Sequence, residues 1–185
     1  GLITHAGIMD ALTGGNMLYS GSLNAIFFVT NASIAPYFQI GSISVAELTV
    51  SDNNGKTRYL SKKLIDHTLG KASYTMPSTY IGLFSADPGQ DGALTDEVAG
   101  ASYVRKALTA SMADTSLANG LSSNETVVEF PLPSESWGTL THFGILDAAS
   151  SGNMLFTRAL PVSQTVDAGG AVPSFPVGRI RLIED

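Results

Sequence analysis

Two histidine–aspartate pairs are the residues of this chain whose types and spacing could do chemistry. His5 and Asp10 stand five residues apart, and His142 and Asp147 repeat that spacing. An imidazole beside a carboxylate can act as a general base, or the two can contribute ligands to a metal ion. Residues five apart on one strand point to opposite faces, so a turn would have to bring each pair together.

The rest of the sequence favours a structural role for these pairs. Three histidines and no cysteine do not supply the three or four nitrogen or sulfur ligands of a zinc site. We expect the aspartates to accept hydrogen bonds from turn amides and the histidines to fill half-buried strand positions. No catalytic residue, metal ligand or cofactor is predicted. The candidate interaction or turn-defining residues are His5, Asp10, Asn16, Trp137, His142, Asp147 and Asn153.

An acidic stretch and a single tryptophan are the other features that could bind a ligand. Residues 86–97 lack the 1-3-5-Gly-12 ligand spacing of a calcium loop, so we interpret them as a solvated hairpin loop. Trp137 is interpreted as core or module-edge packing, with stacking against a ligand as the alternative. The carboxylates of the acidic stretch are Asp87, Asp91, Asp96 and Glu97.

The histidine–aspartate pairs recur because a longer stretch of sequence recurs. Residues 1–23 align without a gap with residues 138–160, at an offset of 137 and with 12 identities. The same register continues to residue 47, where the identities reach 18. Such self-similarity indicates a duplication. Residues 1–47 then correspond to the C-terminal half of a β module, 48–57 to a linker and 58–185 to a complete module.

The complete module is predicted to consist of one helix followed by short strands and tight turns. A helix is expected over 60–69, with Ser61 as its cap and Gly70 as its stop signal. The fold class is therefore mainly β: an antiparallel β-sandwich of jelly-roll type with one short helix, preceded by a half-module of the same type. Strands are expected at 79–85, 101–110 and 125–133, and a loop at 111–124.

Half a sandwich would expose its inner face and its strand edges. We therefore expect residues 1–47 to be completed by another segment, either an upstream part of the protein or a neighbouring subunit that adds a strand.

Composition narrows the possible partners. Hydrophobic residues make up 44% of the chain, which is typical of a folded domain and not of a disordered tail, and the charged fraction of 14% is low even for a globular domain. The formal net charge of −6 offers no basic surface for nucleic acid. No apolar run approaches the length needed to span a bilayer, so no membrane contact is expected.

Three motifs resemble a family of small tailed-bacteriophage virion proteins of the tail-fibre-like type. They are the Tyr-x-x-Leu-Phe-x-Ala-Asp-Pro run at 80–88, Tyr103-x-Arg105, and the segment from Trp137 to Leu155. The resemblance covers about 58–185, and its second half matches again at 1–47.

The resemblance implies a non-enzymatic structural protein at the virion surface. It would act as a homo-oligomer that binds capsid or tail subunits, either as a capsid decoration (cement) protein or as a tail-fibre module. A carbohydrate-binding module is the alternative, with Trp137, Tyr103 and the 86–97 loop as its candidate site. A hydrolase using His142 and Asp147 is a third reading.

Overall fold

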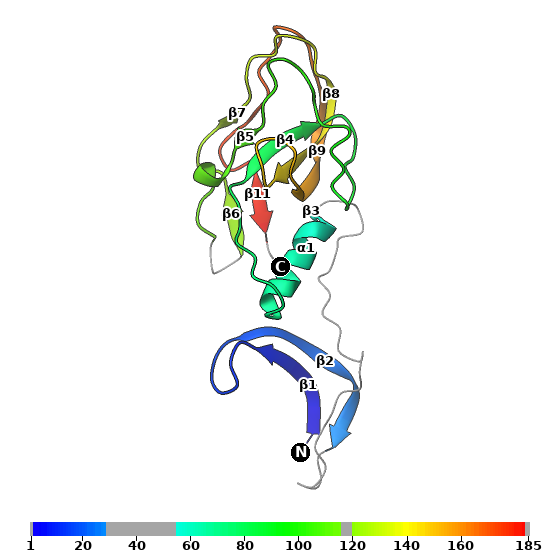
Figure 1. The fold of residues 1–185 in the computed structure, drawn as a ribbon, viewed down its shortest axis with the longest axis vertical. Coiled ribbons are helices and arrows are strands. Elements are labelled where there is room, and N and C mark those ends of the chain that lie inside the picture. Colours follow the sequence, from blue (N-terminus) through cyan, green and yellow to red (C-terminus); the bar gives the residue numbers. More distant parts are fainter. Residues whose placement is uncertain (1, 29–54, 116–119, 184–185) are drawn as a thin grey trace. The chain divides into compact units, whose positions relative to one another are not determined.

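The computed structural model describes residues 2–28, 55–115 and 120–183. The chain divides into two compact units, Gly1–Ala46 and Glu47–Asp185. In the first unit, β1 (Leu2–Met9) and β2 (Met17–Phe28) form an antiparallel hairpin (Figure 1). The later part of the expected half-module, and residues 48–54 of the expected linker, lie outside the described residues.

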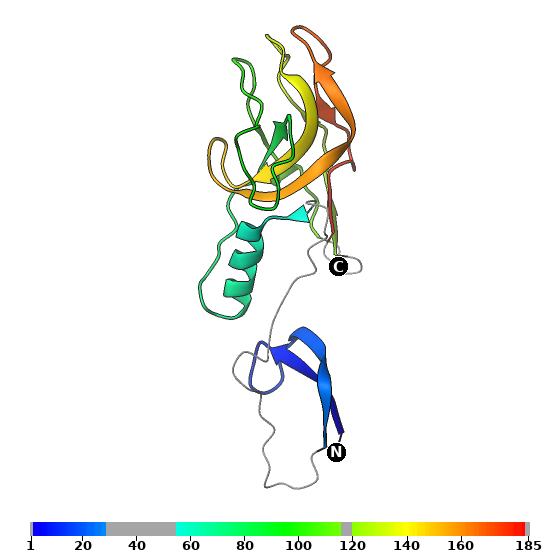
Figure 2. The same cartoon turned by 90° about the vertical axis from the view of Figure 1, so that its right-hand side faces the viewer.

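The second unit is built around a five-stranded sheet in the order β3-β9-β8-β4-β5, with every neighbouring pair antiparallel. Its strands are β3 (Gly55–Lys56), β4 (Tyr80–Phe84), β5 (Lys106–Ala107), β8 (Gly138–Leu146) and β9 (Met154–Val166). The central β8–β9 hairpin curves strongly (Figure 2), and its register shifts at two points, as bulges cause.

Two short antiparallel ladders accompany this sheet. They pair β7 (Val128–Glu129) with β10 (Ser174–Phe175), and β6 (Leu121–Ser123) with β11 (Arg181–Ile183). One α-helix, α1 (Arg58–Thr68), and one 3₁₀ turn, η1 (Thr109–Ser111), complete the elements of the described residues. The mainly β fold with antiparallel sheets and one helix is thus confirmed.

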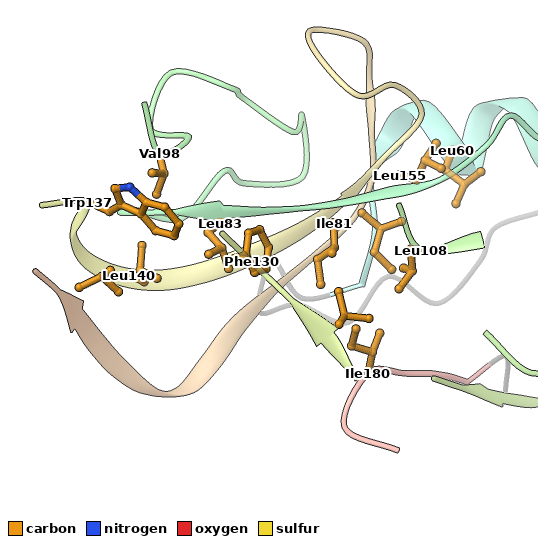
Figure 3. Packing of buried hydrophobic residues seen from close by; sticks show 13 residues of the cluster. Leu60, Ile81, Leu83, Val98, Leu108, Phe130, Trp137, Leu140, Leu155 and Ile180 are labelled. Carbon is orange, nitrogen blue, oxygen red and sulfur yellow. The ribbon is translucent and has the colours of Figure 1, made fainter. Parts of the chain in front are cut away.

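The main core lies between the five-stranded sheet and the short ladders. On β4, Ile81 and Leu83 point to one face because alternate residues of a strand share a face. They pack with Val128 and Phe130 from the β7 region and with Ile180 next to β11. Figure 3 shows Val98, Trp137 and Leu140 together at one end of this cluster, and Leu60 and Leu155 at the end next to the helix.

Helix α1 begins two residues before the expected start, and its cap is not Ser61. Thr57 is the N-cap: its fully buried hydroxyl accepts from Leu60 N at 3.4 Å and donates to Met154 O at 2.5 Å. Ser61 lies inside the helix. The predicted stop is correct, because Gly70 adopts φ +67° and its amide donates to His67 O, as in a Schellman motif.

Two predicted strands, 101–110 and 125–133, and one predicted loop, 111–124, need correction. Only Lys106–Ala107 of 101–110 and only Val128–Glu129 of 125–133 pair as strands. The expected loop at 111–124 contains β6, a Ser-rich strand whose polar residues gave no alternating pattern. Gly55 and Lys56, expected in the linker, pair with β9 as β3.

The two hydroxyls at the start of α1 give a matched test of the capping assignment. Thr57→Ala should destabilise the protein by about 2 kcal/mol, because it removes the cap and leaves the Met154 carbonyl without its donor. Ser61→Ala should change stability by less than about 0.5 kcal/mol, since the buried Ser61 hydroxyl has no partner among the described residues. Urea unfolding followed by circular dichroism measures both, and equal losses would contradict the assignment.

Candidate functional site

The turn between β8 and β9 is closed by hydrogen bonds between Asp147 and Asn153. Asp147 Oδ1 accepts from Asn153 N at 2.6 Å, Oδ2 accepts from Asn153 Nδ2 at 2.8 Å, and Asp147 N donates to Asn153 O at 3.0 Å. We call this arrangement the aspartate clasp. Gly152 has φ +75°, and a Cβ there would collide with the Asp147 carboxylate, so the turn requires glycine.

The β1–β2 turn contains the same clasp. Asp10 accepts from Asn16 N at 2.7 Å and from Asn16 Nδ2 at 2.9 Å, and Asp10 N donates to Asn16 O at 3.1 Å. Gly15 has φ +80° and faces the Asp10 carboxylate in the same way. From His5 to Met17, every strand pair of this hairpin has a counterpart 137 residues later, with shifts in register at the same two points.

A buried arginine holds the 147–153 turn from the side. Arg105, whose side chain is 3% exposed, donates to both carboxylate oxygens of Glu97, from Nε at 2.6 Å and from Nη2 at 2.5 Å. Its Nη1 donates to the carbonyls of Ala148 and Ser151, each at 2.7 Å. We call this set of bonds the arginine clamp. It connects residues 97–105 to the turn through charge-assisted hydrogen bonds.

Tyr103 and Gly82 connect the arginine clamp to the sheet. The Tyr103 hydroxyl donates to Glu97 Oε1 at 3.2 Å and accepts from Leu83 N on β4 at 2.9 Å. A Cβ at Gly82 would lie 3.1 Å from Glu97 Oε1 and 3.2 Å from the Tyr103 hydroxyl, so glycine leaves the room that the network needs.

Burial and charge keep both groups in their usual ionisation states. Burial raises the pKa of the Tyr103 hydroxyl, which therefore stays protonated at neutral pH. The hydrogen bond to Glu97 raises the pKa of Arg105, which keeps its charge.

The acidic stretch is only partly the solvated loop that the sequence suggested. Asp91 is exposed and pairs with the exposed Arg58 at 2.8 Å. Glu97 is largely buried in the arginine clamp instead, because Arg105 neutralises its charge.

The structure does not join the histidines to the aspartates among the described residues. His142 is half-buried on β8, with Nδ1 2.9 Å from Thr141 Oγ1 and Nε2 3.9 Å from Asp87 Oδ1. His5 is exposed on β1, with Nδ1 2.8 Å from Thr4 Oγ1. Each aspartate accepts hydrogen bonds from its turn asparagine, so neither orients a histidine as a general base would require.

Trp137 lies in the core. Its ring meets Tyr103 edge-on, with ring centroids 5.4 Å apart and an interplanar angle of 84°. Tyr103 in turn stacks on Phe130, with ring centroids 6.1 Å apart. The tryptophan is buried, so it presents no open face on which a sugar could stack.

The described residues contain neither a metal-binding group nor a membrane-spanning helix. Within 2–28, 55–115 and 120–183, no group of three or more His, Cys, Asp or Glu side chains could hold a metal ion. None of the helical residues that the structure describes forms a stretch long and apolar enough to cross a bilayer.

The arginine clamp is the part of the site that sequence reasoning missed. Arg105 stood in a predicted strand, where an arginine is usually a solvent-facing residue. The one available signal was the Tyr103-x-Arg105 motif, which the resemblance singled out without giving it a role.

Comparison with known proteins identifies a family that this chain matches. The family model described as Podophage GP4 fiber I protein gp80 matches residues 1–46 and 55–183, so it covers both hairpins. No curated protein matches the chain.

Removing the arginine tests whether the clamp holds the second unit together. Arg105→Met should lower the free energy of unfolding by about 3–5 kcal/mol, because it leaves Glu97 charged and largely buried without a cation to balance it. Arg158→Met, at an exposed arginine on β9, is the control and should change stability by less than about 0.5 kcal/mol. Urea unfolding measures both variants. Similar small losses would show that the clamp is not structurally important.

The aspartate clasp of the first hairpin should be visible in a titration. Hydrogen bonds from the Asn16 side chain, and then from its backbone amide, hold the pKa of Asp10 below its usual value of 3.8. The folded-state pKa is the lower one, so the clasp stabilises the hairpin above about pH 3.8, and this contribution is lost as the pH falls through the lowered pKa.

Asn16→Ala should raise the pKa of Asp10 toward 3.8 in a carboxyl-carbon NMR titration. Asp66 is the control within the same spectrum, because its pKa is lowered mainly by the hydrogen bond from Lys62 and should not change. An unchanged pKa of Asp10 would show that the clasp does not form in solution.

Proposed function

Since this chain belongs to the family of the podophage GP4 fiber I protein gp80, we propose that it is a fibre-type structural module of a tailed-phage virion. The match over both segments is the observation that carries the proposal. The family supports a structural role in the virion and does not suggest an enzyme. The finer assignment, a fibre rather than a capsid decoration, rests on the description of that family.

The chemistry of the candidate site supports an architectural role. Its strongest polar groups bond to one another: Asp147 to Asn153, and Arg105 to Glu97 and the turn carbonyls. Groups used in this way fix the shape of a turn and are not free to bind or transform a substrate. The low charged fraction of 14% also suits a protein whose surface is partly covered by neighbouring subunits.

The two hairpins are, in this proposal, copies of one half-module. Their shared clasp and register support it, together with the 18 identities at one offset. Residues 1–47 would then be the C-terminal half of a second module, completed by another segment or subunit. The protein would act as a homo-oligomer, in which many modest contacts sum to firm attachment to the particle surface.

The two other readings receive no support from the site. A carbohydrate-binding module would need an exposed aromatic platform, and Trp137 is in the core. A hydrolase using His142 and Asp147 would need the Asp147 carboxylate to orient the imidazole, whereas Asp147 bonds to Asn153.

Immunogold electron microscopy of intact particles tests the proposed location. Antibodies raised against the purified chain should place gold on the tail fibres. Gold distributed over the head would identify a capsid decoration protein and overturn the fibre assignment. Particles that carry no gold, while the same antibodies detect the protein in infected cells, would overturn the virion role altogether.

A further inference from the structure

Equivalent residues of the two hairpins differ sharply in exposure. Met17 is 61% exposed and Leu18 41%, whereas their counterparts Met154 and Leu155 are 2% and 0% exposed. Met9 is 44% exposed, and its counterpart Leu146 is fully buried. The hairpin of residues 2–28 therefore presents to solvent the apolar side chains that its counterpart buries in the core.

The strand edges differ in the same way. The β8–β9 hairpin lies in the middle of its sheet, with β4 along β8 and β3 along β9. Among the described residues, β1 and β2 pair only with each other. Each therefore has an edge whose backbone donors and acceptors can bind an added strand.

The second hairpin shows which side chains cover such a surface. Phe84 and Leu94 pack on Leu146 and Met154, and Gly82 of β4 lies opposite Gly144. In the first hairpin the Met17 side chain already lies over Gly7, as that of Met154 lies over Gly144. The surface is thus shaped as its covered counterpart is, and among the described residues no side chains equivalent to Phe84 and Leu94 cover it.

The absence of lysine and arginine in residues 1–55 indicates which group a partner must supply to the first turn. The counterparts of the two carbonyls held by Arg105 are those of Ala11 and Gly14. No lysine or arginine occurs before Lys56 in the sequence, so residues 1–55 have no cation that could form the same bonds. Arg105 itself is fully engaged with Glu97 and the second turn.

We infer that the β1–β2 hairpin is a docking site for a polypeptide segment with the chemistry of residues 80–105. That segment adds an antiparallel apolar strand along β1, opposite Gly7, Ile8 and Met9. It then places a glutamate–arginine pair so that the arginine donates to the carbonyls of Ala11 and Gly14. The inference rests on the proposal that this hairpin is completed by a partner, and not on where in the virion the protein lies.

The full chain and a synthetic peptide of residues 79–106 test the inference. The peptide carries the strand, Leu94, Glu97, Tyr103 and Arg105. With ¹³C-methyl methionine, the five methionines give separate NMR probes. The peptide should shift the Met9 and Met17 signals in a saturable manner. Met154, which is buried by its own partner strand, and the exposed Met76 should not respond.

Matched variants test the arginine hydrogen bonds and the apolar contact separately. A peptide with Arg105→Gln should bind about tenfold more weakly or worse, because two charge-assisted hydrogen bonds to the turn carbonyls are lost. In the protein, Met17→Gln should weaken binding as reported by Met9, whereas Met76→Gln should not.

Three outcomes would overturn the inference. They are unchanged Met9 and Met17 signals at saturating peptide, equal shifts at Met76, and equal affinity of the Arg105→Gln peptide. If the Met9 and Met17 signals change with protein concentration in the absence of peptide, the occupant of the hairpin is instead a second copy of the chain. Immunogold labelling is independent of all these results, so failure of the fibre assignment would be recognised separately.

Discussion

The fold of the second unit depends on the burial of the charged Arg105 side chain. A guanidinium in that position is costly unless its donors are satisfied and its charge is balanced. Glu97 balances the charge, and the carbonyls of Ala148 and Ser151 accept the remaining donors. The turn, the 97–105 segment and β4 must therefore all be correctly placed at once. A small β protein with short ladders gains one defined arrangement from this requirement.

The two hairpins separate local from non-local determinants of structure. The aspartate clasp needs only residues within one turn, and it forms in both hairpins. The arginine clamp joins residues more than 40 positions apart in the chain, and in the part of the chain that the structure describes only the second hairpin has it. Met17 and Met154 show the consequence: the same residue type in the same local geometry is exposed in one hairpin and buried in the other. Burial here is decided by the partner segment.

The same distinction explains what the sequence could predict. The end of the helix at Gly70 can be predicted from the sequence, because it depends only on the conformation of that glycine. The mainly β class can be predicted from the turn-rich pattern. The sequence alone favours Ser61 over Thr57 as the cap, because the second bond of the Thr57 hydroxyl goes to Met154, far away in the sequence. Strand β6 was missed since its pairing with β11 and the buried Asn124 beside it depend on residues more than 50 positions later. The role of Arg105 is hidden for the same reason: its partners come from two separate segments, and the carbonyls of Ala148 and Ser151 lie more than 40 positions later.

A module whose first half binds the turn of its second half through a buried arginine, itself paired with a glutamate of the first half, controls which strands it accepts. Any apolar strand can hydrogen-bond to an open edge, and that lack of selectivity makes exposed edges prone to aggregation. A strand without the glutamate–arginine pair would cover the turn and leave two carbonyls desolvated without donors. The correct partner satisfies them, so the difference in free energy between correct and incorrect strands grows as the site closes. In a structural protein of a virion, this selectivity would justify keeping a buried charge that a well-packed apolar pair could replace without loss of stability.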